Sequence, residues 1–295
     1  MFPLDRIEDI RNHPSDFKLL ERVPFTRDDV QELLPIKLGD PIEGEKIWAV
    51  VFLDTETTGI SHYNDKIIEL GMVRCTFSFT RRRILSIDRI YDGYEDPNRP
   101  IPPEITKLTG ITDEMVKGQK FNEDVILNFV ADNPLVIAHN AKFDRPFVER
   151  RFGSWQPMPW ACSQKEIDWS AFDIGGQKLE FIVQSQGYFY DAHRACTDCL
   201  ALCYLMYKMP QAFEMLIESS LRVTYRVDAY CAPFDIKDEL KRSNYRWDGE
   251  KKVWYIQVNG IDSANAQVAY LENLYAKAPK DVKVFQFTAN DRYRS

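Results

Sequence analysis

The sequence lacks any long apolar segment. No run of 18 apolar residues occurs in its 295 residues, whereas a membrane-spanning helix needs about 20. The opening stretch, "MFPLDRIEDIRNHPSDF", carries acids early and has no apolar centre, so it does not resemble a secretory leader. Without such a leader, the six cysteines are expected to be reduced and mostly buried thiols. We therefore expect a cytoplasmic protein that does not bind a membrane.

The chain also lacks the excess of basic residues that marks most nucleic-acid-binding domains. Lys and Arg number 38 against 45 Asp and Glu, which gives a net charge of −7. This balance does not exclude a metal-dependent nuclease, because the active site of such an enzyme is itself a cluster of carboxylates. Divalent cations bound there reverse the local field. Net charge therefore leaves nucleic-acid binding open.

No internal repeat or low-complexity segment divides the chain, but its pattern changes twice. Five prolines within residues 1–45 predict a lead-in of short helical or irregular pieces. Residues 46–220 contain strand patterns first and helix patterns later, which predicts a mixed α/β sheet flanked by helices. From residue 221 to 295, short strand patterns carry aromatic and basic residues, and we expect a small α+β accessory domain there.

Buried strands are predicted where short apolar runs are rich in β-branched residues, and helices where apolar residues recur at helical spacing. The predicted strands are 48–54, 134–140 and a hairpin of 66–79 with 83–94; the predicted helices are 122–133, 141–152, 178–188 and 194–209.

Four acids stand at the ends of these elements or in apolar surroundings. Asp54 and Glu56 close the first strand in "FLDTETTGI", and Asp144 lies in the first turn of the helix after the second strand. Asp198 lies in an apolar helix, where an acid is costly unless it is paired or bound to metal. Carboxylates are hard oxygen ligands that suit Mg²⁺ or Mn²⁺.

Four such carboxylates can hold two divalent cations on either side of a scissile phosphate. We expect Asp54 to be the ligand shared by both cations. His193 precedes Asp198 by five positions in "HRACTD", and a histidine there can accept the proton of the attacking water at neutral pH.

Three motifs carry a resemblance to a known family. "DTETTG", "AHNAKFDRPF" and "HRACTD" resemble, in order and spacing, the exonuclease motifs of the DnaQ-like DEDDh 3′–5′ exonucleases, over roughly residues 47–207. The resemblance implies an RNase H-like fold and two-metal hydrolysis of DNA from the 3′ end to nucleoside 5′-monophosphates. It assigns the metal ligands to Asp54, Glu56, Asp144 and Asp198, and the catalytic roles to His193 as general base together with Glu56.

The same resemblance implies a set of substrate-binding residues. Some match the turn after the first strand, some match positions lining the same groove, and one aligns with a nucleotide-contacting position in "LTGITDEMV". These residues are Thr57, Thr58, Gly59, Thr109, Asn140 and Phe143. The implied partner is a DNA 3′ end, with single strands favoured, and a homodimer is compatible with the family.

Other functions stay open at this point. The same carboxylates would serve a 3′–5′ exoribonuclease, because the 2′-hydroxyl is read by groove shape. A non-catalytic nucleic-acid-binding protein on this fold is a further alternative, although all five catalytic positions are present. Cys196 and Cys199 form a C-x-x-C pair that would suit zinc or redox chemistry. With Cys203 they also follow one face of a helix, and a second C-x-x-C pair is lacking, so we favour structural thiols.

The C-terminal region contains "YRWDGEKKVWY", where Asp-Gly predicts a hairpin turn. Rings and cations alternate there, so bases could stack on rings while cations meet phosphates. The alternative is that the tryptophans, Trp247 and Trp254, form the core of a small domain. The pattern is similar to HARP-like domains of annealing helicases.

Overall fold

The computed structural model describes residues 4–26, 30–153, 158–277 and 279–294. A six-stranded sheet forms its centre, in the order β2-β5-β4-β3-β6-β7. Strands β3, β4 and β5 are antiparallel neighbours, whereas β6 and β7 run parallel to β3. The strands are β2 (Ile36–Lys37), β3 (Ile47–Thr57), β4 (Ile67–Ser78), β5 (Arg83–Tyr94), β6 (Leu135–Ala138) and β7 (Trp160–Cys162).

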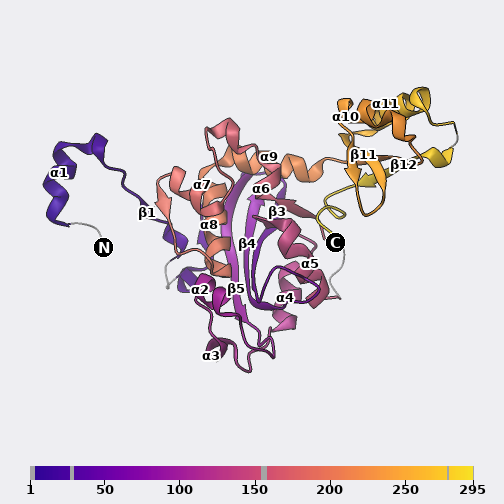
Figure 1. Ribbon diagram of the computed structural model, residues 1–295. Coiled ribbons are helices and arrows are strands. Elements are labelled where there is room, and N and C mark those ends of the chain that lie inside the picture. The colour runs from indigo at the N-terminus through magenta and orange to yellow at the C-terminus, as the bar shows by residue number, and fades with distance from the viewer. Residues whose placement is uncertain (1–3, 27–29, 154–157, 278, 295) are drawn as a thin grey trace.

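Helices cover both faces of this sheet, and the alternation along β3 shows why. Val50 and Phe52 pack into the apolar cluster formed with α7, α8 and α9, whereas Val51 and Leu53 pack into the cluster formed with α4 and α5. Figure 1 shows α7 and α8 on one side of the central strands and α4 and α5 on the other. A strand buried on both faces reads as a continuous apolar run. The mixed sheet between two helical layers confirms the predicted RNase H-like α/β architecture.

The predicted helices are present, with ends that differ by a few residues. They are α4 (Glu123–Val130), α5 (Ala141–Arg151), α7 (Leu179–Ser185) and α8 (Ala195–Lys208). The remaining helices around the sheet are α2 (Pro103–Thr109), α3 (Asp113–Val116), α6 (Ser163–Glu166) and α9 (Pro210–Leu221).

Helix α8 lies unusually close to the sheet at Gly71. A Cβ atom at Gly71 would lie 2.3 Å from the backbone carbon of Ala195 and 2.3 Å from the backbone nitrogen of Cys196. Only a residue without a side chain allows this approach. Because Gly71 is the register partner of Asp54, the contact brings the first turns of α8 beside the carboxyl end of β3.

The N-terminal lead-in consists of short pieces, as predicted. They include α1 (Ile7–Asn12) and β1 (Glu21–Arg22), which pairs in parallel with β8 (Tyr188–Phe189). Strand β2 joins the edge of the main sheet beside β5, so part of the lead-in belongs to the sheet. Within the described residues, no helix has the length and apolar character required to cross a bilayer.

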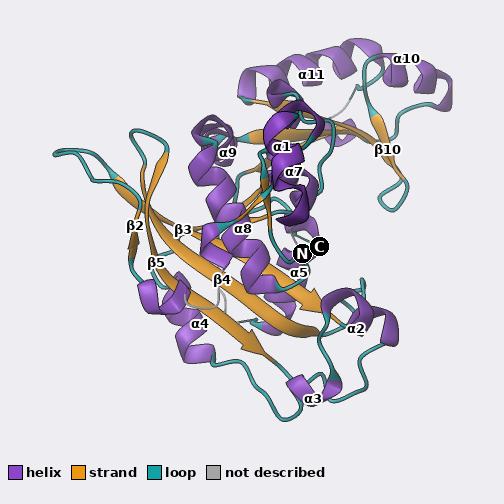
Figure 2. Ribbon diagram, turned by 90° about the vertical axis from the view of Figure 1, so that its left-hand side faces the viewer, coloured by secondary structure: helices purple, strands orange, loops and turns teal. Residues whose placement is uncertain are grey.

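The C-terminal region forms a second, four-stranded sheet with two helices (Figures 1 and 2). The predicted hairpin is present, and a last strand that the sequence did not predict follows the final helix. The elements are β9 (Thr224–Ala229), α10 (Lys237–Arg242), β10 (Arg246–Asp248), β11 (Val253–Asn259), α11 (Ile261–Leu274) and β12 (Val282–Phe287). Trp254 packs against the core of this module, whereas Trp247 is 52% exposed. The structural interpretation therefore holds for Trp254.

Candidate active site

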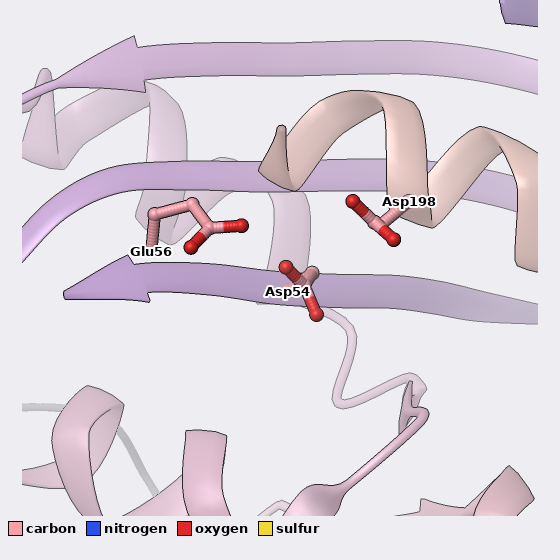
Figure 3. Close-up of side chains that lie close together, drawn as sticks. All are labelled: Asp54, Glu56 and Asp198. Atoms are coloured by element: carbon pink, nitrogen blue, oxygen red, sulfur yellow. The ribbon is translucent and has the colours of Figure 1, made fainter. Parts of the chain in front are cut away.

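The end of β3 and the start of α8 bring three carboxylates together. Asp54 and Glu56 project from the same face of β3, because side chains alternate along a strand, and Asp198 faces them from α8 (Figure 3). One carboxylate oxygen from each residue lies within 4.8 Å of the others. Within the described part of the chain, this is the one group of acidic, histidine or cysteine side chains close enough to hold a metal ion.

Asp144, in the first turn of α5, is not part of this close group but faces the same cavity. Its Oδ1 accepts hydrogen bonds from the backbone nitrogen of Thr55 at 3.1 Å and from the Thr55 hydroxyl at 2.9 Å. Since Thr55 lies between Asp54 and Glu56, these two bonds tie α5 to the strand that carries the other acids. All four carboxylates line a single cavity of about 380 Å³.

The crowding of acids raises their pKa values. Removal from bulk water is the largest cause at all four residues. It raises the pKa of Glu56 to about 8, of Asp144 to about 7 and of Asp198 to about 6, and the repulsion of neighbouring acids contributes at Glu56 and Asp144. The pKa of Asp54 is raised well above its ordinary value by the same effects. The four carboxylates offer only oxygen ligands, which suit divalent cations, and bound cations would neutralise the repulsion between them.

Hydrogen bonds from Tyr190, outside the sequence motifs, and from Arg194, inside "HRACTD", hold Asp198. The Tyr190 hydroxyl donates to Oδ1 at 2.8 Å, and the backbone nitrogen of Arg194 donates to Oδ2 at 3.1 Å. Tyr190 is buried and lines the same cavity. Sequence reasoning missed Tyr190, because nothing in "GYFYDAH" distinguishes a tyrosine that supports a ligand from one that packs in the core.

A further buried acid outside the cavity lining, Glu69, fixes the start of α8. It is the register partner of Glu56 on β4 and is 0% exposed. Its carboxylate accepts from the Arg194 side chain at 3.0 Å and from the backbone nitrogen of Ala195 at 2.9 Å. These bonds satisfy an otherwise unpaired amide at the helix N-terminus. Glu69 was also absent from the sequence prediction.

Two histidines line the cavity, and their surroundings differ. The ring of His139 is engaged at both nitrogens, by the Ser163 hydroxyl at 2.9 Å and the Gln177 carbonyl at 2.7 Å, and burial lowers its pKa. His193 is exposed and occupies the left-handed region, at φ 67°. This backbone conformation, uncommon outside glycine, is favoured several-fold by His, Asn and Asp. His139 is therefore part of the wall, whereas His193 is available to the cavity.

The predicted substrate-binding residues divide into two groups. Asn140 and Phe143 line the cavity with the carboxylates. Thr57, Thr58 and Gly59 form the turn after β3. In this turn, the Thr57 hydroxyl donates to the Gly59 carbonyl at 2.6 Å, and a Cβ at Gly59 would lie 2.6 Å from the Asp65 carboxylate.

Thr109 lies apart from the cavity at the end of α2. Its hydroxyl donates to the Ile105 carbonyl at 2.9 Å and accepts from the backbone nitrogen of Ile111 at 3.1 Å. Both bonds serve the end of this helix. Neither Thr109 nor the turn at residues 57–59 is among the residues that line the cavity.

The cysteines of α8 pack against β4. The sulfur of Cys203 lies 3.4 Å from that of Cys75, and the Cys199 thiol donates to the Gly71 carbonyl at 3.4 Å. Burial raises the pKa of both Cys199 and Cys196 well above the ordinary value of a thiol. Neutral buried thiols support the structural interpretation over a zinc or redox site.

Comparison with known proteins agrees with this geometry. A family model described as "Exonuclease" matches residues 51–206, slightly more than half of the chain. The DNA polymerase III PolC-type of Clostridium perfringens is 40% identical over 156 residues, which cover 50% of this chain and 10% of that protein. The corresponding protein of Staphylococcus epidermidis (strain ATCC 35984) is 29% identical over 212 residues, covering 68% of this chain and 14% of that protein. The chain thus spans only a small fraction of the length of these curated relatives.

Two solved structures resemble parts of the fold. One is exonuclease X in complex with 5′ overhanging duplex DNA, with 23% identity and a TM-score of 0.44, covering 57% of this chain and 98% of that one. The other is the nuclease domain of 3′hExo, a DEDDh family member bound to rAMP, with 16% identity and a TM-score of 0.45, covering 58% of this chain and 94% of that one. On the match to the family model over residues 51–206, the chain belongs to the exonuclease family.

Proposed function

We propose that this protein is a metal-dependent 3′–5′ exonuclease that hydrolyses DNA from the 3′ end and releases nucleoside 5′-monophosphates. One observation carries the proposal: the four carboxylates of Asp54, Glu56, Asp144 and Asp198 converge on one cavity that His193 also lines. DNA is favoured as substrate because the curated relatives named above are DNA polymerases.

The four carboxylates would hold two divalent cations, Mg²⁺ or Mn²⁺, with Asp54 shared between them. When bound, the cations would lower the pKa of the attacking water and stabilise the leaving 3′ oxygen. Tyr190 and Thr55 keep the carboxylates of Asp198 and Asp144 in place through their hydrogen bonds. Because these carboxylates are already in position, they do not have to rearrange when negative charge develops on the phosphate in the transition state.

The remaining residues of the cavity handle the proton and the nucleotide. His193, exposed beside the carboxylates, accepts the proton of the attacking water. Asn140 offers a polar amide and Phe143 an aromatic ring to the terminal nucleotide, since both line the cavity. Thr57, Thr58 and Gly59 shape the turn at the end of β3. We further propose that residues 46–220 are the exonuclease domain and that residues 221–295 form an accessory domain.

The proposal is tested with matched DNA and RNA oligonucleotides, single-stranded and duplex, each labelled at the 5′ end. Wild type is compared with Asp144→Asn, and Asp173→Asn serves as the control because Asp173 is exposed in a loop outside the cavity. A ladder that shortens from the 3′ end with Mg²⁺ or Mn²⁺ is expected for wild type and the control. The ladder should be absent with EDTA and with Asp144→Asn.

Each other outcome assigns a different function. Degradation of RNA in preference to DNA would make the protein an exoribonuclease. Binding without hydrolysis under every condition would make it a nucleic-acid-binding protein and would refute the catalytic proposal. Sedimentation of the intact chain tests for the homodimer that the family resemblance allows.

A further inference from the structure

The C-terminal module has the chain order β9-α10-β10-β11-α11-β12, and its sheet has the order β10-β11-β9-β12 with antiparallel neighbours throughout. This is the split βαβ arrangement, with the first and third strands of the module at the centre. The same type of four-stranded sheet binds single-stranded RNA in one common recognition module, where rings on the sheet stack with bases.

One face of this sheet is covered by the two helices. Val227, Ala229, Leu240 and Leu271 belong to the module's core, with Ile256 packed against it. Figure 2 shows α10 and α11 on the same side of the strands. The alternate residues of the central strands therefore point to the opposite face, which the module's own helices leave uncovered.

The uncovered face combines rings with polar and basic groups. Register places Gln257, Arg226 and Phe285 in one row across three strands. The next row contains Tyr255, Asp228 and Lys283, and Asp228 is buried beneath its neighbours at 0% exposure. Phe285 is 41% exposed, and the Arg226 guanidinium lies 4.0 Å from the centre of the Tyr255 ring.

Arg226 is held in that position by two acids. It pairs with Asp228 at 2.5 Å and with Asp248 at 2.8 Å, so its charge is largely compensated. The Arg226 side chain, which is 12% exposed, therefore fixes the Tyr255 ring and adds little free charge. Bases stack on aromatic rings and on guanidinium planes alike.

A basic cleft of about 670 Å³ connects this face to the exonuclease domain. Its cations come from α5, from the segment after α9, from β9 and from the C-terminal segment, and one acid, Asp291, is present. The cationic lining residues are Lys142, Arg222, Arg226, Arg292 and Arg294. Arg226, Arg292 and Arg294 are paired with Asp248, Glu166 and Glu149. Within the described residues, Lys142 and Arg222 are therefore the lining cations without an ion pair, and these two can meet a phosphate backbone.

Among the residues that the structure describes, the cleft and the carboxylate cavity share no lining residue, but the start of α5 contributes to both. Lys142 lines the cleft, whereas Asn140 and Phe143, on either side of it in the chain, line the cavity. The C-terminal segment that forms one wall is fixed to the same helix. The fully buried guanidinium of Arg145 donates to the carbonyls of Arg292 at 2.6 Å and Asn290 at 2.7 Å.

From this geometry we infer that a single-stranded nucleic acid, with its 3′ end in the carboxylate cavity, continues through the basic cleft onto the uncovered face of the C-terminal sheet. Its phosphates meet the cations of the cleft, and its bases stack on Phe285 and on the Arg226–Tyr255 pair. The inference rests on the proposed exonuclease function for the polarity of the strand. It predicts that long strands bind more tightly than strands too short to extend from the cavity across the sheet.

The test uses the full chain with single-stranded thymidine oligonucleotides of 3 and 20 residues and a uridine 20-mer. Phe285→Ala removes one exposed ring from the uncovered face. Phe234→Ala is the control, because this ring is 76% exposed and lies in a 3₁₀ turn, Phe234–Ile236, just before α10. Arg222→Glu tests the cleft, and Arg242→Glu on α10 is its control with the same change in net charge.

Phe285→Ala is expected to raise KM and the dissociation constant for the 20-mers at least about fivefold. This factor corresponds to the smallest free energy, about 1 kcal/mol, expected for loss of one base–ring stacking contact. Values for the 3-mer and kcat should not change, and neither control should have an effect. Arg222→Glu should weaken binding of the 20-mers more than Arg242→Glu, and it should reduce the dependence of binding on salt. Unchanged dissociation constants for the 20-mers in both test variants, which thermal unfolding shows to be folded, would overturn the inference.

Binding measured by fluorescence anisotropy in EDTA separates the two proposals. Loss of 20-mer binding in the test variants, together with absence of hydrolysis by wild type, would refute the exonuclease proposal and retain the binding surface. Hydrolysis by wild type with no length dependence would retain the exonuclease and refute the surface. Comparison of the thymidine and uridine 20-mers shows whether the surface distinguishes DNA from RNA.

Discussion

Replacing Asp54 by asparagine should make the metal-free protein more stable at neutral pH while it abolishes hydrolysis. Removal from water is the largest cause that raises the pKa of Asp54, and the repulsion of Asp144, Asp198 and Glu56 adds to it. A carboxylate whose pKa is raised by folding keeps its proton in the folded state at a pH where the unfolded chain has lost it. Stability therefore falls as pH rises from about 4, the ordinary pKa, towards the folded-state value.

The magnitude follows from the proton balance. Each proton that the folded state holds in excess costs about 1.4 kcal/mol of unfolding free energy for each pH unit. Between pH 5 and pH 7, one residue contributes at most about 3 kcal/mol, and Asp54 contributes less because it is partly exposed to the cavity. For a chain of this length that upper limit corresponds to roughly 6 °C in the unfolding temperature.

The assay is thermal unfolding of wild type and Asp54→Asn in EDTA at pH 5 and pH 7, with Asp173→Asn as the control. The advantage of Asp54→Asn over wild type should grow from pH 5 to pH 7, whereas the control should follow wild type. Added Mg²⁺ or Mn²⁺ should stabilise wild type more than Asp54→Asn, because a ligand stabilises only the state that binds it. An Asp54→Asn protein no more stable than wild type at pH 7 would refute the argument that the carboxylates repel one another.

Three further predictions concern the supports of the site. Gly71→Ala should lower the unfolding free energy by about 1–3 kcal/mol or more, because its Cβ would meet the backbone of Ala195 at 2.3 Å; denaturant unfolding measures this, and a fully stable variant would contradict the close packing of α8. Tyr190→Phe removes a hydrogen bond to Asp198 and should raise the Mg²⁺ concentration for half-maximal rate about tenfold, whereas an unchanged Mg²⁺ titration would show that the hydroxyl is dispensable. His193→Gln should lower kcat by roughly 10²- to 10⁴-fold with the Mg²⁺ titration unchanged, and a wild-type pH–rate profile in this variant would remove His193 from the mechanism.

Much of the fold and of the acid cluster could be predicted because the signals are local. The apolar run before Asp54 predicts a strand buried on both faces, and the spacing of Asp54 and Glu56 puts both on one face of it. The supports of the cluster could not be predicted in this way. Glu69 meets Ala195 across 126 positions of the chain, and no local pattern distinguishes this buried glutamate from a solvated one.

The same reasoning explains why the role of the C-terminal segment was not predicted. Arg145 follows Asp144 directly in "AKFDRPF". From sequence alone, a charged residue on a helix is predicted to be exposed to solvent. In the structure its guanidinium is 0% exposed and donates to carbonyls of residues about 145 positions later. A charged group is buried only where its donors are satisfied, so the acceptors that explain Arg145 lie in another part of the chain.

These contacts join the carboxylate cavity and the C-terminal sheet into one unit. Asp144 is fixed on one side by Thr55, which belongs to the strand of Asp54 and Glu56. The residue after Asp144 is fixed on the other side by the segment that closes the C-terminal module. Displacement of that segment would leave the buried Arg145 guanidinium with its ion pair to Glu149 on the same helix, at 2.9 Å, but without these carbonyl acceptors. A buried donor left without an acceptor costs about 1–3 kcal/mol. The helix that supplies Asp144 to the carboxylate cavity therefore also anchors the C-terminal segment that lines the cleft.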